Sequence, residues 1–404
     1  MDKKVKKSIE LNNSLKFNFH LSLKDGSFDS FLNKFLNDSS LKRIHLKKYE
    51  NNLSVLLANL YLSYKQDKFL AISLSKNFYV LPKKYNPKYL RWDILEKIIT
   101  YLQNNNYLEM YKGYKQGNVT RLTRIKLNKS FFENENINWN YTIQTDFENY
   151  SYVVLKDSDK KLIKFKETPL VKRRIKVIRD FNLILNENYV TYKNRFLSCS
   201  PMYRVFNNGS FKQGGRFYGG EFQRLSKKER KLIKINGKDV VELDYSCLHI
   251  NLLYDREKIK YKKDAYEIGY KSEHSRKMIK FILITMLNSS SKKDAISAVR
   301  YNFNRSGIKA KINIEKVIDL LLDKHKRISK YFFNKENGLT LQYQESLLAE
   351  YIIKNFIYGK KGKVILPIHD GFICEKKYEQ KLKRVMIQAY KKFIGNNNYK
   401  ITKI

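Results

Sequence analysis

The sequence predicts a folded α+β protein, and three observations carry this prediction. First, its 404 residues include 42% apolar and 14% aromatic residues but only 5 prolines, enough for sizeable cores in two or three domains. Second, several segments place apolar residues at helical intervals. Third, two segments are typical of strands: the hydrophobic run at 240–243, and residues 363–376, which the Asp370-Gly371 turn signal splits into two β-type runs.

The expected elements follow one another along the chain. A glycine-rich segment at 214–220 precedes a charged helix for which Ser226 is a suitable N-cap. The pair Asn236-Gly237 marks a turn before the strand at 240–243. Helices are predicted, in chain order, over 170–185, 226–234, 248–253, 273–290, 313–331, 341–357 and 379–393.

The charge points to a polyanionic partner. Lys and Arg number 81 against 39 Asp and Glu, a formal net charge of +42. Like charges at this density repel one another and destabilise a compact fold unless a polyanion screens them, so nucleic acid is the expected partner. The abundance of Lys, Asn, Ile and Tyr also fits the codons of an A+T-rich genome, which leaves compositional drift as a second explanation.

Other patterns exclude several classes of protein. The longest apolar runs, such as Leu53–Leu62, are about half the ~20 residues that cross a bilayer, so we expect no transmembrane helix and no membrane partner. The basic N-terminus lacks the apolar stretch of a signal peptide, which predicts a cytoplasmic protein. Cys199, Cys247 and Cys374 have no metal-site spacing and are predicted to be reduced thiols.

Two aspartates and a cationic helix face form the candidate catalytic group. Asp244 ends the hydrophobic strand, Asp370 lies at the tip of the predicted hairpin, and Arg276 and Lys280 are four residues apart on one helix. Two-metal nucleotidyl transfer needs paired carboxylates for Mg²⁺, or for Mn²⁺ in its place, and a separate cationic face for a triphosphate. Each signal alone also fits a turn former, an N-cap or a solvated stripe.

Five short segments occur in a set order: Gly215-Arg216, Leu243-Asp244-Tyr245-Ser246, Arg276-x3-Lys280, Gln344 and Ile368-His369-Asp370-Gly371. In this order they resemble the palm and fingers of the single-subunit polymerase superfamily, which includes family A DNA polymerases and phage-type RNA polymerases. The resemblance implies a right-hand architecture with a small antiparallel palm sheet, helical fingers and a mostly helical N-terminal and thumb region. It implies two metal ions held by Asp244, Asp370 and the backbone carbonyl of Tyr245. It also implies nucleotide or nucleic-acid contacts by Arg216, Arg276, Lys280, Gln344 and His369.

The chain departs from that family at the positions that select the sugar. Family A DNA polymerases have a glutamate where this sequence has His249, and aromatic residues where it has Ile284 and Asn288. We expect these three residues to contribute to the nucleotide-binding surface. The departures leave the choice between dNTPs and NTPs open.

Three regions are predicted: an N-terminal domain of unknown role at 1–165, a thumb-like basic helical region at 166–204, and a palm and fingers core at 205–404. Arg173 and Arg174, on the 170–185 helix, are candidate nucleic-acid contacts. An ordinary surface helix is the alternative interpretation of that segment.

The predicted function is template-directed nucleic-acid polymerisation on a DNA or RNA primer-template, with a family A DNA polymerase favoured. The alternatives are an RNA polymerase or primase-like enzyme, a catalytically degenerate nucleic-acid-binding protein, and a two-metal nuclease. By analogy alone, a small polymerase without recognisable proofreading motifs suits a phage, plasmid or other mobile element.

Overall fold

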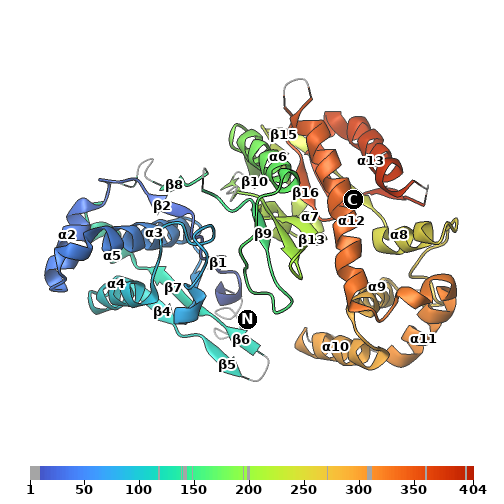
Figure 1. Ribbon diagram of the computed structural model, residues 1–404, viewed down its shortest axis with the longest axis horizontal. Coiled ribbons are helices and arrows are strands. Elements are labelled where there is room, and N and C mark those ends of the chain that lie inside the picture. Colours follow the sequence, from blue (N-terminus) through green and yellow to red (C-terminus); the bar gives the residue numbers. More distant parts are fainter. Residues whose placement is uncertain are drawn as a thin grey trace. The chain divides into compact units, whose positions relative to one another are not determined.

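The computed structural model describes residues 10–116, 119–137, 139, 143–147, 149–193, 195–197, 201–270, 272–306, 312–359, 362–395 and 398–404. Cys199 lies outside these residues. The chain forms two compact units, Met1–Ser151 and Tyr152–Ile404, coloured blue to cyan and green to red in Figure 1. Their boundary precedes the predicted one at 165. Strand β9 (Val153–Leu155) belongs to the second unit because it pairs in parallel with β12 (Tyr203–Asn207).

The first unit combines helices with short strands, although we expected a mostly helical region. A four-stranded sheet has the order β1-β3-β7-β4, and the pairs β2-β8 and β5-β6 stand apart from it. These strands are two to five residues long, too short for a two-residue alternation to show in the sequence. The strands are β1 (Leu15–Lys16), β2 (Leu21–Leu23), β3 (Leu70–Ile72), β4 (Leu108–Tyr111), β5 (Tyr114–Gln116), β6 (Val119–Arg121), β7 (Thr123–Leu127) and β8 (Ile143–Thr145). The helices are α2 (Asp29–Asp38), α3 (Leu46–Lys65), α4 (Trp92–Asn104) and α5 (Lys129–Asn134).

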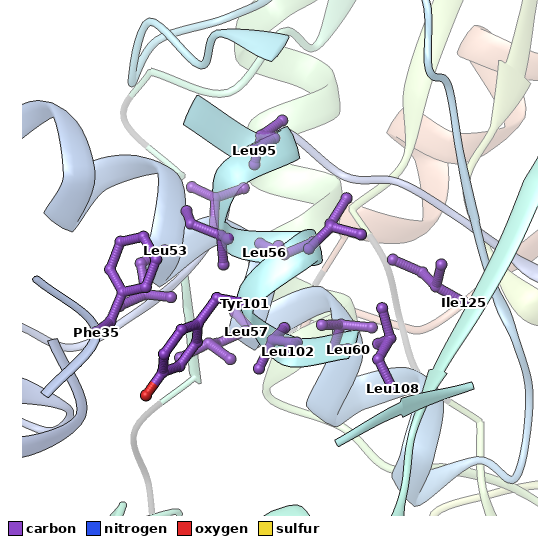
Figure 2. Close-up of a cluster of buried hydrophobic side chains, with 14 of the residues drawn as sticks. Phe35, Leu53, Leu56, Leu57, Leu60, Leu95, Tyr101, Leu102, Leu108 and Ile125 are labelled. Atoms are coloured by element: carbon purple, nitrogen blue, oxygen red, sulfur yellow. The ribbon is translucent and has the colours of Figure 1, made fainter. Parts of the chain in front are cut away.

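Helix α3 runs through the core of this unit. Every residue from Asn52 to Leu60 is buried, and Figure 2 shows Leu53 beside Phe35, with Leu56 and Leu57 in the same cluster. A helix that is apolar all round is typical of a core position. Its buried amide, Asn59, bonds the backbone of Asn18 in both directions, at 2.8 and 2.9 Å, so no polar atom there lacks a partner.

The second unit is built on an antiparallel sheet of order β11-β10-β14-β15-β17-β16, with β18 paired to the end of β15. Asn236 and Gly237, both with positive φ, form the predicted turn between β14 and β15. The predicted hairpin near Asp370 is confirmed, but its turn residues are His369 and Asp370, one position earlier than the Asp-Gly signal indicated. The strands are β10 (Val190–Tyr192), β11 (Arg195–Phe196), β14 (Ile233–Ile235), β15 (Lys238–Tyr245), β16 (Leu366–Ile368), β17 (Gly371–Glu375) and β18 (Ile401–Lys403).

A smaller sheet, β13-β12-β9, lies against the long helix α12. On β13 (Ser210–Tyr218), Gly215 has φ +84°, and a Cβ there would lie 2.8 Å from Ser346 Oγ on α12. Glycine is therefore required for the close approach of strand and helix. This approach sets the next residue, Arg216, against α12.

Helices surround α12 in the second unit, and α6, α8, α9 and α13 all contact it (Figure 1). The predicted helix at 226–234 ends at Arg230, because Ile233 starts β14, and the one at 313–331 changes to a 3₁₀ turn after Lys324. The helices are α6 (Pro169–Asn186), α7 (Lys227–Arg230), α8 (Leu248–Arg256), α9 (Glu273–Asn288), α10 (Lys292–Arg305), α11 (Ile314–Lys324), α12 (Lys335–Ile357) and α13 (Glu379–Ile394). The 3₁₀ turns within the described residues are η1 (Arg43–His45), η2 (Lys76–Phe78), η3 (Glu221–Arg224), η4 (Lys326–Tyr331) and η5 (Lys376–Tyr378).

The mixed α+β class is thus confirmed. Among the residues that the structure describes, no helix has both the length and the apolar content needed to span a membrane.

Candidate functional site

Asp244 and Asp370 lie side by side on the central sheet. In the antiparallel pairing of β15 with β17, Asp244 is opposite Gly371, the residue after Asp370. The amide of Tyr245 donates to the carbonyl of Asp370 at 3.2 Å. Two carboxylates 126 positions apart in sequence are therefore fixed on neighbouring strands.

The surroundings of both carboxylates favour bound cations. Burial, with the charge of Asp370 adding to it, raises the pKa of Asp244 to about 7. Burial and the charge of Glu345 likewise raise the pKa of Asp370. Asp244 Oδ1 is buried and has no hydrogen-bond partner. An unpartnered buried carboxylate oxygen is costly unless a cation or a proton occupies it.

The donor set suits Mg²⁺ better than a transition metal. In the described part of the chain, no group of three or more His, Cys, Asp or Glu side chains is placed to hold a metal ion. Mg²⁺ typically binds to one or two carboxylates and keeps water and substrate phosphates as its other ligands. Asp244 and Asp370 fit that pattern. The backbone carbonyl of Tyr245 stays a predicted ligand; its ring is buried and its hydroxyl donates to the carbonyl of Met386 at 2.5 Å.

Helix α9 presents the predicted cationic face. It begins after Ser272, whose hydroxyl accepts from the amide of Ser275 as an N-cap, and Arg276 and Lys280 are both exposed. The charge of Lys227 and, to a smaller extent, that of Lys280 lower the pKa of Asp244. The charge of Lys280 also lowers the pKa of Asp370, so Lys280 lies within electrostatic range of both carboxylates. Arg276 instead forms an ion pair with Asp264, Nη1 to Oδ2, at 2.6 Å.

A tyrosine that the sequence analysis missed lies beside this face. Tyr266 is buried, and its ring centroid is 5.2 Å from the guanidinium of Arg276 and 6.0 Å from Nζ of Lys280. Cation–π contacts of this kind hold both cations against one ring. From the loop that precedes α9, Tyr266 thus contacts both cations and Asp264 pairs with one of them.

The other two predicted positions on α9 differ from each other. Ile284 is exposed on the same face as Lys280. The amide of Asn288 donates to the carbonyl of Ile284, and a Cβ on Gly338 would lie 2.1 Å from Asn288 Oδ1. The side chain of Asn288 is therefore packed against the start of α12. Its role toward a nucleotide stays a prediction.

On α12, Glu345 is the residue that contacts Arg216 and His249; the role predicted for its neighbour Gln344 stays a prediction. Arg216 bonds Glu345 twice, Nε to Oε1 at 2.8 Å and Nη2 to Oε2 at 2.5 Å, and His249 Nε2 lies 2.9 Å from Oε2. Burial alone would raise the pKa of Glu345, but Arg216 and His249 outweigh it and hold that pKa at about 2. Gln344 accepts a bond from Arg256 at 3.3 Å, away from this cluster.

His369 occupies the turn between β16 and β17. Its φ is +57°, in the left-handed region, and its ring centroid is 6.2 Å from that of Tyr218. Arg216, Glu345 and His369 line one narrow crevice. The structure thus brings Asp244, Asp370, Lys280, Arg216, His249 and His369 into one region of the second unit, with Glu345 among them.

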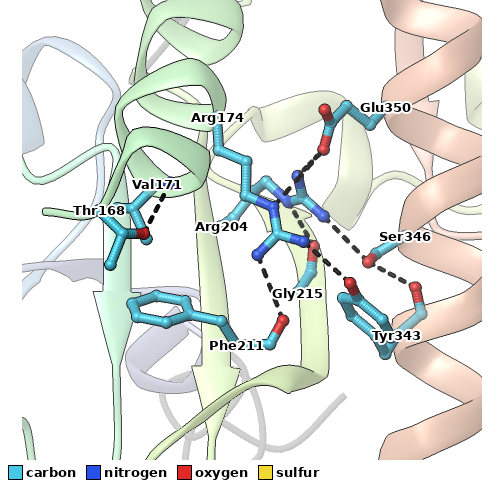
Figure 3. Close-up of polar contacts among 9 residues, drawn as sticks. All are labelled: Thr168, Val171, Arg174, Arg204, Phe211, Gly215, Tyr343, Ser346 and Glu350. Atoms are coloured by element: carbon cyan, nitrogen blue, oxygen red, sulfur yellow. Dashed lines mark hydrogen bonds and ion pairs between the residues drawn. The ribbon is translucent and has the colours of Figure 1, made fainter.

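Arg174 is not available to nucleic acid, which corrects its predicted role. Its side chain is buried, and its guanidinium donates to the carbonyl of Phe211 at 3.2 Å and to the hydroxyl of Tyr343 at 3.0 Å (Figure 3). Arg174 lies on the same face of α6 as Val171 and Ile178, which points into the unit. Arg173 is exposed and stays a candidate contact.

A second buried arginine completes this interior cluster. Arg204 is 0% exposed; it forms an ion pair with Glu350 and bonds the carbonyl of Gly215 at 2.7 Å and Ser346 Oγ at 3.0 Å (Figure 3). Every bond joins β12 to β13 or α12. These bonds therefore hold β13, which carries Arg216, and α12, which carries Glu345, beside β12.

No protein-family model matches this chain, and no curated protein matches it. One solved structure that is similar to part of it is the POL domain of Pol1 from M. smegmatis in complex with DNA primer-template and dNTP. The identity is 13% and the TM-score 0.30, and the match covers 58% of this chain and 51% of that one. The chain thus matches about half the length of that domain, and the likeness is too low to carry a functional argument.

Proposed function

We propose that the second unit is a template-directed nucleic-acid polymerase with a right-hand core, and that a DNA polymerase of the family A type is the favoured form. The observation that carries this proposal is the carboxylate pair: Asp244 and Asp370 are adjacent on β15 and β17, a buried oxygen of Asp244 is left unpartnered, and the charge of Lys280 acts on both. A nuclease needs no triphosphate site, so it leaves the cationic face of α9 without a use.

Different residues have different roles in the proposed nucleotidyl transfer. Asp244 and Asp370 would hold two Mg²⁺ ions, which when bound supply activation of the attacking hydroxyl and stabilisation of the leaving pyrophosphate. Lys280 and Arg276 bind the triphosphate as preorganised cations. Arg216 and His369 contact the primer-template from the crevice they share with Glu345.

The sugar preference is a finer part of the proposal. Where family A enzymes carry a glutamate on the strand-to-helix segment, this chain has His249, and the negative charge comes from Glu345 on α12, 2.9 Å away. The carboxylate is thus supplied from another element. An RNA polymerase or primase-like enzyme is the alternative, because this contact alone does not exclude a ribose.

The test is primer extension on DNA and RNA templates, with dNTPs and NTPs compared, and with and without a primer. We expect Asp244→Asn and Asp370→Asn each to lower the rate more than about 100-fold, since loss of a mere supporting residue of a metal site costs about 10–100-fold. Asp239→Asn is the matched control, because this aspartate lies on the same strand but its side chain is 78% exposed. Its rate should stay within about twofold of wild type.

Two results would contradict the proposal. One is substantial extension by either purified carboxylate variant. The other is a wild-type protein that binds primed template yet yields no product with Mg²⁺ or Mn²⁺, which would favour the catalytically degenerate binding protein.

A further inference from the structure

The first unit contains a loop whose two ends are tied together by one buried side chain. Asn86 is 3% exposed, and its Nδ2 donates to the carbonyls of Tyr79 and Leu90, at 3.1 and 3.0 Å. The amide of Leu90 donates back to Asn86 Oδ1 at 2.8 Å. Residues 79–90, here called the 79–90 loop, therefore form a closed surface loop of the Ω type.

Further contacts fix this loop to the body of the unit. The ring of Tyr79 stacks against that of Trp92 with centroids 6.1 Å apart, and its hydroxyl donates to the carbonyl of Ser73 at 2.9 Å. The hydroxyl of Ser151 donates to the carbonyl of Lys84. The loop is thus a fixed platform, held at both ends and in the middle.

The platform turns an aromatic ring toward solvent. Tyr89 is 61% exposed and has φ +53°, a left-handed conformation that is uncommon for a bulky residue. Phe78, just before the loop, and Val80 within it are also exposed. Strained backbone and outward apolar groups persist only where the surrounding structure holds them, and such positions cluster at binding sites.

The same segment is strongly basic. Residues 74–91 include Lys76, Lys83, Lys84, Lys88 and Arg91 and contain no Asp or Glu. Nζ of Lys83 lies 6.0 Å from the ring centroid of Tyr89, so one cation sits beside the exposed ring. The local charge is complementary to a phosphate backbone.

We propose that the 79–90 loop binds single-stranded nucleic acid, with an unpaired base stacked on Tyr89 and backbone phosphates on Lys83 and Lys88. Exposed aromatic rings that alternate with cations are the general means of binding single strands. A duplex offers phosphates but no free base face, so it can use the lysines and not the ring. This role is independent of the proposed catalysis, because every residue in it belongs to the first unit.

The test uses the full chain and a single-stranded oligonucleotide that carries 5-iodouracil, without nucleotides or divalent metal. Irradiation should cross-link the base to Tyr89, as located by peptide mass spectrometry. The Asp244→Asn variant should cross-link equally well, which separates this result from any failure of the proposed catalysis.

Affinity for a fluorescent single strand gives the second measurement. We expect Tyr89→Gly, which tolerates the positive φ, to weaken binding about 5- to 100-fold, since stacking on one aromatic contributes about that factor. Tyr89→Phe keeps the stacking face and should bind like wild type. Tyr301→Ala, which removes an exposed tyrosine of α10, is the matched control and should have little effect.

Three outcomes would overturn the proposal. The first is the absence of any cross-link within the peptide that contains residues 79–90. The second is unchanged affinity in Tyr89→Gly, or equal losses in Tyr89→Gly and Tyr301→Ala. The third is Tyr89-dependent binding to phosphatidylglycerol vesicles without binding to the oligonucleotide, which would make the loop a lipid contact.

Discussion

The two units solve the problem of buried polar groups in different ways. The interior of the first unit relies mainly on neutral side chains, such as Asn59 and Ser54, which bond nearby backbone groups. The second unit pairs its buried charges with buried or part-buried partners: Arg204 with Glu350, Glu345 with Arg216, and Arg230 with Glu242. Buried pairs are poor stabilisers because both charges lose their hydration. They do fix charges in place, which is what the proposed nucleotidyl transfer would require.

Net charge follows the same division. Residues 1–151 contain 25 Lys and Arg against 14 Asp and Glu, a net charge of +11, whereas residues 152–404 contain 56 against 25, a net charge of +31. Compositional drift alone would spread basic residues evenly along the chain. The excess therefore gathers in the unit that carries the carboxylate pair.

The largest expected effect is on stability, from removal of one buried charge. Arg204→Ala removes the shorter of the two ion pairs of Glu350, leaving only Arg174 Nε at 3.9 Å, and should lower the free energy of unfolding by about 3–5 kcal/mol. Asn59→Ala, the counterpart in the first unit, loses only neutral bonds and should lower it by about 1–3 kcal/mol. Urea denaturation would measure each loss in the free energy of unfolding. Hydrogen exchange would show in which unit the loss occurs. Equal losses would break the distinction drawn between the two interiors.

A smaller effect should appear in the pH dependence of the metal-free protein. The pKa of Asp244 is about 7 in the folded state and near 4 in the unfolded chain, so ionising it costs stability: the cost is absent below about pH 4 and complete above about pH 7. Asp244→Asn should therefore raise Tm at pH 8 and leave it unchanged at pH 4. Asp25→Asn, at an exposed position of the first unit, is the control. A Tm gain at pH 8 that equals the control's would contradict the burial argument.

The smallest effect concerns the exposed cation of α9. Asp264→Asn releases Arg276 from its ion pair, and a partly exposed pair is worth about 0.2–1 kcal/mol. We expect nucleotide to bind up to about fivefold more tightly, as seen in KM for primer extension. Glu133→Gln, which releases Lys129 in the first unit, should leave KM unchanged. Weaker nucleotide binding by Asp264→Asn would show that Asp264 orients Arg276 rather than competing for it.

The sequence was most informative where local patterns decide the structure. The helix starts at Ser226 and Ser272, the Asn236-Gly237 turn and the hairpin near Asp370 depend on residues within a few positions of each other. Partners far apart in sequence leave no such local signal. No residue near Glu345 in the sequence indicates that it contacts Arg216 and His249. The sequence pattern therefore indicated the adjacent Gln344 instead.

The helical pattern does contain a signal for the burial of Glu345 and Arg174. Glu345 falls on the buried face of α12 with Leu341 and Leu348, and Arg174 falls on the buried face of α6 with Val171. A charged residue at an apolar position of a helical repeat implies a buried partner of opposite charge or polar character. That rule would have moved Arg174 from the surface to the interior.

The pairing of β18 with β15 has a consequence for biosynthesis. The strand that carries Asp244 is flanked on one side by β17 and on the other, at Thr402, by β18. During translation the first unit can fold while the rest is still being made, since domains fold as units in the order of synthesis. Strand β15, which carries Asp244, has both of its neighbours in place only once residues 401–403 have been made and paired. A chain that ends before residue 401 should therefore leave the edge of β15 beside Asp244 unpaired.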